Sequence, residues 1–98
     1  MTIVSIIERQ RGCKDEIILL PQGAFYHAYE DGAKNLTSVM GYKLRSATIR
    51  KSHLSYVFCG FPISAIDKVL TRLAIMYKNC MISIEEYGIA AIIKIDSL

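Results

Sequence analysis

The sequence contains no tryptophan, only two prolines and only three cysteines among its 98 residues. Cys13, Cys59 and Cys80 are odd in number and widely spaced, which argues against a disulfide framework and fits no zinc-binding pattern. No apolar run approaches the roughly 18 residues that a membrane-spanning helix needs. The N-terminal segment meets Glu8 and Arg9 where a signal peptide would extend its apolar region. We therefore expect a cytoplasmic protein with reduced, structural cysteines.

Acidic residues are missing from the middle of the chain. Every Asp and Glu lies at or before Asp31, or at or after Asp67, although the net charge is only +3. Between these limits stand five fixed positive charges, with His53 close behind: Lys34, Lys43, Arg45, Arg50 and Lys51. This window is typical of a surface that faces phosphates, and an ordinary solvated face is the alternative.

The length predicts one domain spanning residues 1–98. The order of helix and strand signals along it predicts an α/β fold, with a mixed β-sheet and about three packed helices. Its 52% hydrophobic content is sufficient for a filled core. Helices are expected at residues 2–11, 30–41 and 62–79, with Thr2 capping the first, Gly41 ending the second and a Ser64–Asp67 capping box opening the third. Strands are expected at residues 16–20, 25–29, 42–49, 54–58, 81–84 and 89–95.

The segment 23–29 is the most informative in the chain. Gly23 and Ala24 follow an apolar strand, and a glycine at this point lets the backbone turn sharply. Phe25 comes next, so its ring is expected at an exposed edge, whereas Tyr26 alternates toward the core. Exposed aromatic wedges of this kind are inserted between nucleic-acid bases. The segment therefore predicts a DNA-binding function before any family is considered.

The order of these signals resembles the N-terminal, mismatch-reading domain of MutS-type DNA mismatch-repair proteins, over roughly residues 5 to 95. The segments that carry the resemblance are Glu16-Ile17-Ile18-Leu19-Leu20, Gly23-Ala24-Phe25-Tyr26-His27, Glu30-Asp31-Gly32-Ala33-Lys34, Gly41-Tyr42-Lys43-Leu44, Cys59-Gly60-Phe61-Pro62, the helix with Ala65, Leu70 and Leu73, and Cys80-Met81-Ile82-Ser83-Ile84-Glu85-Glu86. No single motif is specific, but five in the family's order and spacing are hard to obtain by chance.

The resemblance implies a stand-alone DNA-binding domain whose partner is double-stranded DNA with a mismatch or distortion, as in the repair of DNA damage. It implies that Phe25 is the base-stacking wedge and that His27 stands where the family has a glutamate that hydrogen-bonds a base edge. Lys43, Arg45, Arg50 and Lys51 are expected to hold the DNA backbone.

Two features differ from the complete repair proteins. The sequence has no Walker A motif, so no ATPase is predicted in this polypeptide. His27 cannot reproduce the purely accepting role of a carboxylate, so weaker or altered discrimination is expected.

Three other interpretations remain open from the sequence. Phe25 is a core aromatic in one of them. In another the fold serves only as a protein-interaction module that self-associates or pairs with a MutS-type repair protein, through strand edges near residues 89–95. A metal-free nuclease would use Tyr26, His27 or His53, and Lys43, but nothing in their spacing requires it. No clustered carboxylates are found, so we predict no catalysis, metal site or cofactor.

Overall fold

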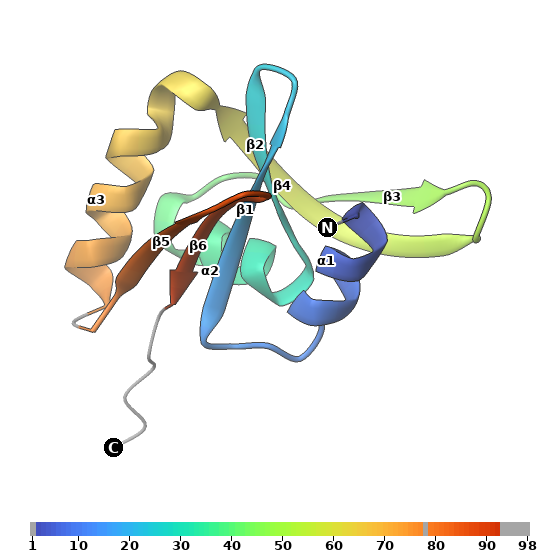
Figure 1. Cartoon of the computed structure of the whole chain (residues 1–98), viewed down its shortest axis with the longest axis horizontal. Helices are drawn as coiled ribbons and strands as arrows, with labels where there is room; N and C mark the ends of the chain where they lie inside the picture. Colours follow the sequence, from blue (N-terminus) through green and yellow to red (C-terminus); the bar gives the residue numbers. More distant parts are fainter. Residues whose placement is uncertain (1, 78, 93–98) are drawn as a thin grey trace.

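The computed structural model of the chain describes residues 2–77 and 79–92, which form six strands, three α-helices and one 3₁₀ turn (Figure 1). The elements in chain order are α1 (Ile3–Gln10), β1 (Glu16–Gln22), β2 (Phe25–Tyr29), α2 (Glu30–Met40), β3 (Arg45–Ile49), β4 (Leu54–Pro62), η1 (Ile63–Ala65), α3 (Ile66–Met76), β5 (Met81–Glu85) and β6 (Gly88–Ile92). The predicted α/β class with three helices is confirmed.

The strands form one sheet in the order β3-β4-β2-β1-β6-β5. All five neighbouring pairs are antiparallel, where the sequence predicted strands of both directions. The two edge strands among the described residues are β3 and β5. The interaction edge expected near residues 89–95 is therefore wrong for β6, which pairs on both sides, with β1 and with β5. Residues 93–95 of that prediction lie outside the described part.

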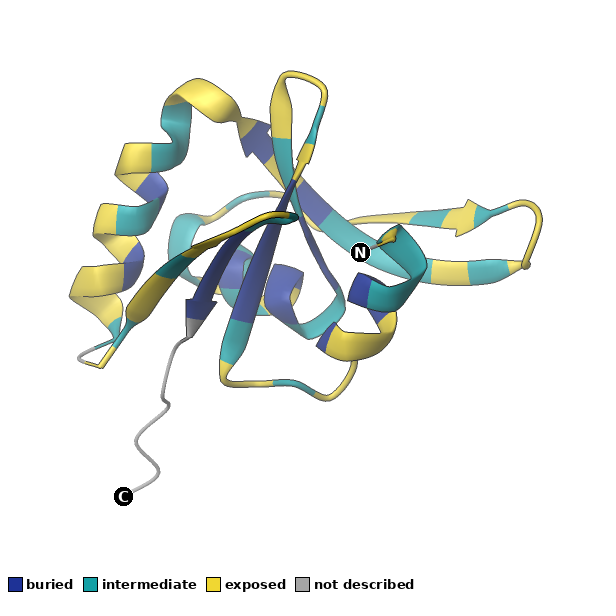
Figure 2. Ribbon diagram, in the orientation of Figure 1, coloured by how far each residue is buried: buried dark blue, intermediate teal, exposed yellow. Residues whose placement is uncertain are grey.

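Each face of the sheet has its own core. Ile17, Leu19 and Phe61 point to the face that α2 and α3 cover, and they pack with Leu36 and Leu73 from those helices. The other face packs against α1, which buries its isoleucines on residues of β1 and β2. Figure 2 shows the buried residues gathered in the middle strands, with β5 and the long β3–β4 hairpin mostly exposed. Because α1 is only eight residues long, it covers only part of its face.

Of the three helix caps predicted from the sequence, two are confirmed. Thr2 and Ser5 form a reciprocal capping box at the start of α1. Gly41 ends α2 with a φ of +74°, a left-handed conformation that favours glycine. The Ser64–Asp67 capping box is wrong, because residues 63–65 form a 3₁₀ turn and Ala65 occupies the N-cap without a side-chain hydrogen bond. The helix also ends at Met76, before the predicted Asn79.

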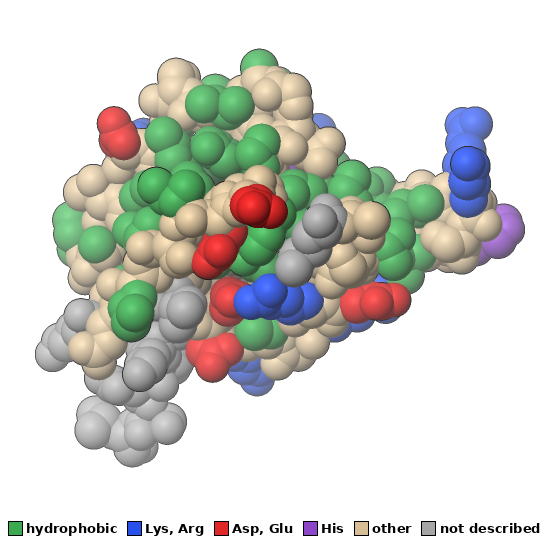
Figure 3. All heavy atoms as spheres, in the orientation of Figure 1, with side chains coloured by type: hydrophobic (Ala, Val, Ile, Leu, Met, Phe, Trp, Pro, Cys, Tyr) green, Lys and Arg blue, Asp and Glu red, His purple; other side chains and the backbone are tan. Residues whose placement is uncertain are grey.

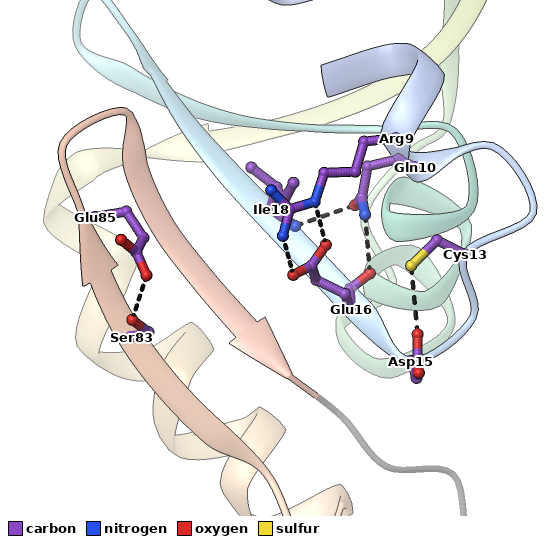
Figure 4. A network of polar contacts seen from close by, with 8 residues as sticks. All are labelled: Arg9, Gln10, Cys13, Asp15, Glu16, Ile18, Ser83 and Glu85. Atoms are coloured by element: carbon purple, nitrogen blue, oxygen red, sulfur yellow. Dashed lines mark hydrogen bonds and ion pairs between the residues drawn. The ribbon is translucent and has the colours of Figure 1, made fainter. Parts of the chain in front are cut away.

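The buried side-chain amide of Gln10, on α1, forms hydrogen bonds with the backbone of β1 at the point where β1 no longer pairs with β2. The Gln10 side chain is fully buried, its Nε2 donates to the Glu16 carbonyl at 3.2 Å, and its Oε1 accepts from the Ile18 N–H at 3.0 Å (Figure 4). Beyond Leu20 and His27 the β1–β2 pairing stops, because the chain turns into α2 after Tyr29. The amide of Gln10 therefore satisfies backbone groups of β1 that would otherwise be buried without partners.

A second polar link fixes the start of α2 against β4. Glu30 has a φ of +50°, and its carboxylate accepts from the Val57 N–H at 2.8 Å and from Arg11 Nε at 2.6 Å. Arg11 also donates to the Ser55 carbonyl at 2.8 Å. Burial alone would raise the pKa of Glu30, but these donors outweigh it and lower the pKa. The link holds β4 in register beside β2, where the candidate site is built.

Candidate nucleic-acid interface

The part of the sheet face that α1 leaves open carries the predicted wedge. In β2, Phe25, His27 and Tyr29 point to this face because side chains alternate along a strand. Their directly paired partners on β4 share the face, with Pro62 opposite Phe25, Gly60 opposite His27 and Phe58 opposite Tyr29. Tyr26 points the other way and packs against the core at 5.8 Å from the Phe61 ring centroid, as predicted.

Phe25 begins β2 directly after the turn at Gly23 and Ala24. Gly23 has a φ of +61°, so the turn uses the conformational freedom expected of this glycine. The Ile63 N–H donates to the Ala24 carbonyl at 3.0 Å and holds the turn against the end of β4. Phe25 is 48% exposed, so the ring that the sequence placed at an exposed edge does lie at the surface. The interpretation of Phe25 as a core aromatic is wrong.

A cavity of about 310 Å³ opens beside the Phe25 ring. Its lining consists of Phe25, His27, Arg45, Phe58 and Gly60. Three of these residues carry flat rings, one carries a guanidinium group and one exposes only backbone. The cavity thus brings together three of the predicted site residues, which are Phe25 and His27 from β2 and Arg45 from β3.

His27 lies along the wall of this cavity. Its ring centroid is 5.2 Å from that of Phe58 and 6.2 Å from that of Tyr29. A methyl group added at Gly60 would lie 2.7 Å from His27 Cδ2, so the imidazole occupies space that only glycine leaves. Burial lowers the pKa of His27 below its usual value of 6.5. The ring is therefore neutral at pH 7, with one nitrogen that donates and one that accepts.

Arg45 supplies the positive charge of the cavity. It opens β3 and pairs with Phe58, one strand further from Phe25 than β4. The side chain is exposed, and it forms no ion pair with an acid in the described residues. Its charge is therefore available to a ligand.

The other predicted cations do not line the cavity. Lys43 is exposed two positions before Arg45, whereas Arg50 and Lys51 lie in the turn that joins β3 to β4. Figure 3 shows positive side chains and a histidine at the end of this hairpin, projecting away from the body. Phe25 pairs with Pro62 and the turn begins beyond Leu54, so eight residues of strand put the hairpin tip about 27 Å from the wedge.

Lys34, the first cation of the acid-free window, belongs to a different surface. It lies on α2, which covers the opposite face of the sheet, and its Nζ is 3.7 Å from Asp31. The window is therefore divided between the two sides of the sheet, and only its part from Lys43 onward is compatible with the wedge.

Phe58 and Gly60 are the site residues that sequence reasoning missed. The predicted strand at residues 54–58 is too short, since β4 continues to Pro62 and brings both residues beside His27. A glycine inside an apolar strand is a known signal of close approach by another group. Gly60 gives this signal in the sequence, but only the register of β4 beside β2 shows that the group close to it is His27.

A larger cavity of about 530 Å³ lies between the end of α2 and α3. It is lined in part by Asp67, Lys68 and Arg72. These charges have both signs, and none of the predicted site residues lines it. It therefore offers no concentrated positive potential for a nucleic acid.

The described residues contain no group of three or more potential metal ligands, and none of their helices is long and apolar enough to cross a membrane. The three cysteines are free, and burial raises the pKa of Cys59 to about 12. Cys59 is thus an inert core side chain, as predicted.

The candidate site lies within the region matched by a known family. The family model of MutS domain I matches residues 6–86, which include Phe25, His27, all four predicted backbone-binding cations and the cavity-lining residues Phe58 and Gly60. No match was found among proteins of curated function. The family match accounts for most of the chain and agrees with the α/β architecture. The chain belongs to the MutS domain I family, the mismatch-recognition domain of MutS-type proteins.

Proposed function

We propose that this domain binds double-stranded DNA and prefers sites where base stacking is weakened, with Phe25 as the inserted ring. The observation that carries the proposal is the exposure of Phe25, 48% for the residue, beside a cavity that Arg45 also lines. Arg45 forms no ion pair with an acid in the described part of the chain. An exposed ring next to such a cation is suited to a base stack flanked by phosphates. The proposal contains no catalytic step and no ATP hydrolysis.

Selectivity follows from two nearly equal free energies. Stacking one base on an aromatic ring stabilises the complex by roughly 1–3 kcal/mol. Opening a step of duplex DNA costs a few kcal/mol. On sound duplex the two nearly cancel, whereas at a mismatch or bulge the opening cost is smaller. The domain then recognises the weakness of the stack rather than its sequence.

The cations supply affinity without selectivity. Arg45 and Lys43 would contact phosphates near the wedge, and Arg50 and Lys51 would contact a more distant part of the backbone. Each phosphate that is neutralised adds about −0.9 to the slope of log affinity against log salt. We therefore expect binding that weakens steeply with salt on paired and mismatched duplexes alike.

His27 is expected to change which mismatches the domain prefers. A neutral imidazole can donate to or accept from a base edge, whereas the family's glutamate only accepts. We expect a range of preferred mismatches different from that of a glutamate-containing domain.

Binding of the whole chain to matched duplexes tests the proposal. Two duplexes that differ only in one mismatched pair are titrated at low and at moderate salt, by gel shift or fluorescence anisotropy. The proposal predicts tighter binding to the mismatched duplex at both salt concentrations and weaker binding to both as salt rises. Equal, salt-insensitive failure on both duplexes would contradict it.

A second function, self-association or pairing with a MutS-type partner, is supported by the edge strand β5. Met81, Ile82 and Ile84 on this strand are 61%, 42% and 85% exposed. An apolar edge strand is a template for pairing with another chain. If β5 pairs with a second copy, Ile84→Lys should convert a concentration-dependent dimer to a monomer in light scattering. A monomer at all concentrations in the unchanged chain would rule out self-association through this edge.

A further inference from the structure

The outer side of β5 carries backbone groups that no strand among the described residues pairs with. β5 stands at the end of the sheet, beside β6 alone (Figure 1). Native edge strands are protected by lysine, proline or a bulge. β5 reads Met-Ile-Ser-Ile-Glu and has none of these, whereas the opposite edge strand, β3, begins with the charged Arg45. The edge at β5 is therefore suited to pairing with another strand.

We infer that β5 pairs with β5 of a second copy, antiparallel and centred on Ser83, so that the two sheets join into one. This inference rests on the self-association proposed above and names its register. Ile82 then lies opposite the partner's Ile84, and Ser83 lies opposite the partner's Ser83. The contact is closed by a two-fold axis, the commonest symmetry of soluble homo-oligomers.

The direction of the backbone groups on β5 follows from the hydrogen bond between Ile18 and Gln10. The Ile18 N–H donates to Gln10 Oε1 and thus points away from β6 (Figure 4). In an antiparallel ladder, residues whose groups point to one neighbouring strand alternate with residues whose groups point to the other. Ile18 pairs with Ala90, and Ala90 pairs with Ser83. The backbone groups of Ala90 therefore point to β5 and those of Ser83 to β6, so the groups of the isoleucines on either side of Ser83 point to the open edge.

The register centred on Ser83 matches these directions. Ile82 and the partner's Ile84 both turn their N–H and C=O groups toward each other, as a hydrogen-bonded pair requires. A shift by one residue would place outward-pointing groups opposite inward-pointing ones. A shift by two residues would pair Ile84 with Cys80 or Ile82 with Glu86, and part of the strand would lose its partner.

The side chains that meet in this register are apolar. Ile82 and Ile84 pair within the chain with Ala91 and Ile89, which belong to the core under α2 and α3, so both isoleucines stand on that face of the sheet. They are 42% and 85% exposed. In the dimer the isoleucines of one copy lie directly opposite those of the other, where β-branched side chains stabilise a strand pair.

Charge does not oppose this pairing. Glu85 is the charged residue of β5, and in this register it lies opposite the partner's Met81. The two copies of Glu85 stand at opposite ends of the paired segment, roughly 14 Å apart, which exceeds the Debye length of about 8 Å at physiological ionic strength. Within each copy the Ser83 hydroxyl also donates to Glu85 Oε1 at 2.6 Å (Figure 4).

The pairing leaves the candidate DNA-binding face free. β6 and β1 lie between β5 and β2, the strand that carries Phe25. The spacing of strands puts β2 roughly 14 Å from the paired edge. Self-association and DNA binding are therefore separable by mutation.

Disulfide crosslinking of the full chain tests the register. Ser83→Cys places two thiols at a non-hydrogen-bonded pair, where the Cα atoms are about 4.5 Å apart and within the range that a disulfide spans. Mild oxidation should convert most of this variant to a covalent dimer joined at position 83, as read by non-reducing electrophoresis and peptide mass spectrometry. The unchanged chain keeps its three free cysteines, Cys13, Cys59 and Cys80, and should give almost no covalent dimer.

Ile84→Cys is the matched control. Its thiol would be diagonal to the same position in the partner, with Cα atoms roughly 7–8 Å apart, which is too far for a disulfide. Oxidised alone, this variant should stay uncrosslinked, whereas a mixture with Ile82→Cys should form the covalent dimer because these positions are directly opposite. Thermal unfolding confirms that each variant is folded.

The outcomes separate the register from self-association. Light scattering of the unchanged chain should show a dimer whose fraction rises with protein concentration. If that dimer forms but Ser83→Cys stays uncrosslinked, or Ile84→Cys alone crosslinks as readily, the register is overturned and self-association stands. A monomer at all concentrations, with no crosslinking of Ser83→Cys, overturns both. The oxidised Ser83→Cys dimer should keep the DNA binding of the unchanged chain, and loss of that binding on crosslinking would contradict the separation of this edge from Phe25.

Discussion

Because Gln10 packs against Gly32, we expect Gly32→Ala to lower the free energy of unfolding, although alanine normally stabilises a helix relative to glycine. Gln10 is fully buried and satisfies two backbone groups of β1. A Cβ at Gly32, in the first turn of α2, would collide with the Gln10 Oε1 atom. The two residues are therefore mutually required: the amide needs the space that glycine leaves, and β1 needs the amide.

The magnitude follows from the two hydrogen bonds. Gln10→Leu keeps the volume but leaves the buried Ile18 N–H without a partner and the Glu16 carbonyl partly so. A buried unsatisfied group costs about 1–3 kcal/mol, so the expected loss in the free energy of unfolding is about 2–4 kcal/mol. For a domain of this size that corresponds to a fall in Tm on the order of 10–20 °C.

A double-mutant cycle tests the reasoning more sharply than either variant. Gly32→Ala alone should destabilise the domain by an amount close to that of Gln10→Ala, because the alanine displaces the amide. In the Gln10→Ala background the same change should be neutral or slightly stabilising, since alanine favours a helix over glycine by up to about 1 kcal/mol. Urea denaturation of the four proteins measures the coupling. Additive effects within about 0.5 kcal/mol would refute this account.

Three further predictions concern the cations of the β3–β4 turn, the hydrogen bonds of Glu30 and the role of His27. Arg50→Ala with Lys51→Ala should weaken binding equally on paired and mismatched duplexes and reduce the slope of log affinity against log salt by about 1.8. Because the hairpin tip is about 27 Å from Phe25, the effect should vanish on duplexes with fewer than about eight base pairs beside the mismatch. An unchanged effect on such short duplexes would disprove the assignment of these two cations to the DNA backbone. The pKa of Glu30 is lowered by folding, so its contribution to stability is present above the unfolded pKa near 4.5 and is lost as the pH falls through the lower folded value. Glu30→Gln should therefore cost roughly 1–2 kcal/mol at pH 7 and flatten the acid limb of the stability curve, whereas an unaltered pH profile in chemical denaturation would show that the link with Arg11 is unimportant. His27→Glu should sharpen discrimination between mismatched and paired duplexes in anisotropy titrations if the site is a reader with an altered acceptor, and equal discrimination would remove His27 from the reading site.

Local sequence signals predicted the parts of the fold that depend on near neighbours. Thr2 and Gly41 were identified as helix ends because capping involves residues within one turn. The exposure of Phe25 followed from the Gly23 turn and the alternation of a strand. Ser64 failed as a cap because the chain forms a 3₁₀ turn after Pro62, a choice that the neighbouring residues alone do not determine.

The features that escaped prediction depend on which strands pair. Phe58 and Gly60 join the site only because β4 lies beside β2 in one register, with Gly60 opposite His27. A shift of one residue would move both to the other face. The same reason explains why β6 proved to be an interior strand and β5 the edge. The exposure of the Phe25 ring could be predicted from its local sequence, but the cavity beside it depends on how β2, β3 and β4 pair.

Photo-crosslinking from the DNA tests the central claim most directly. A duplex with 5-iodouracil at a mismatched or bulged position is irradiated in complex with the full chain, and the modified residue is identified by mass spectrometry. The account predicts attachment to Phe25, with a much lower yield from the fully paired duplex and none in Phe25→Ala. Attachment to the β3–β4 turn instead, or equal yields from paired and mismatched duplexes, would contradict insertion of this ring.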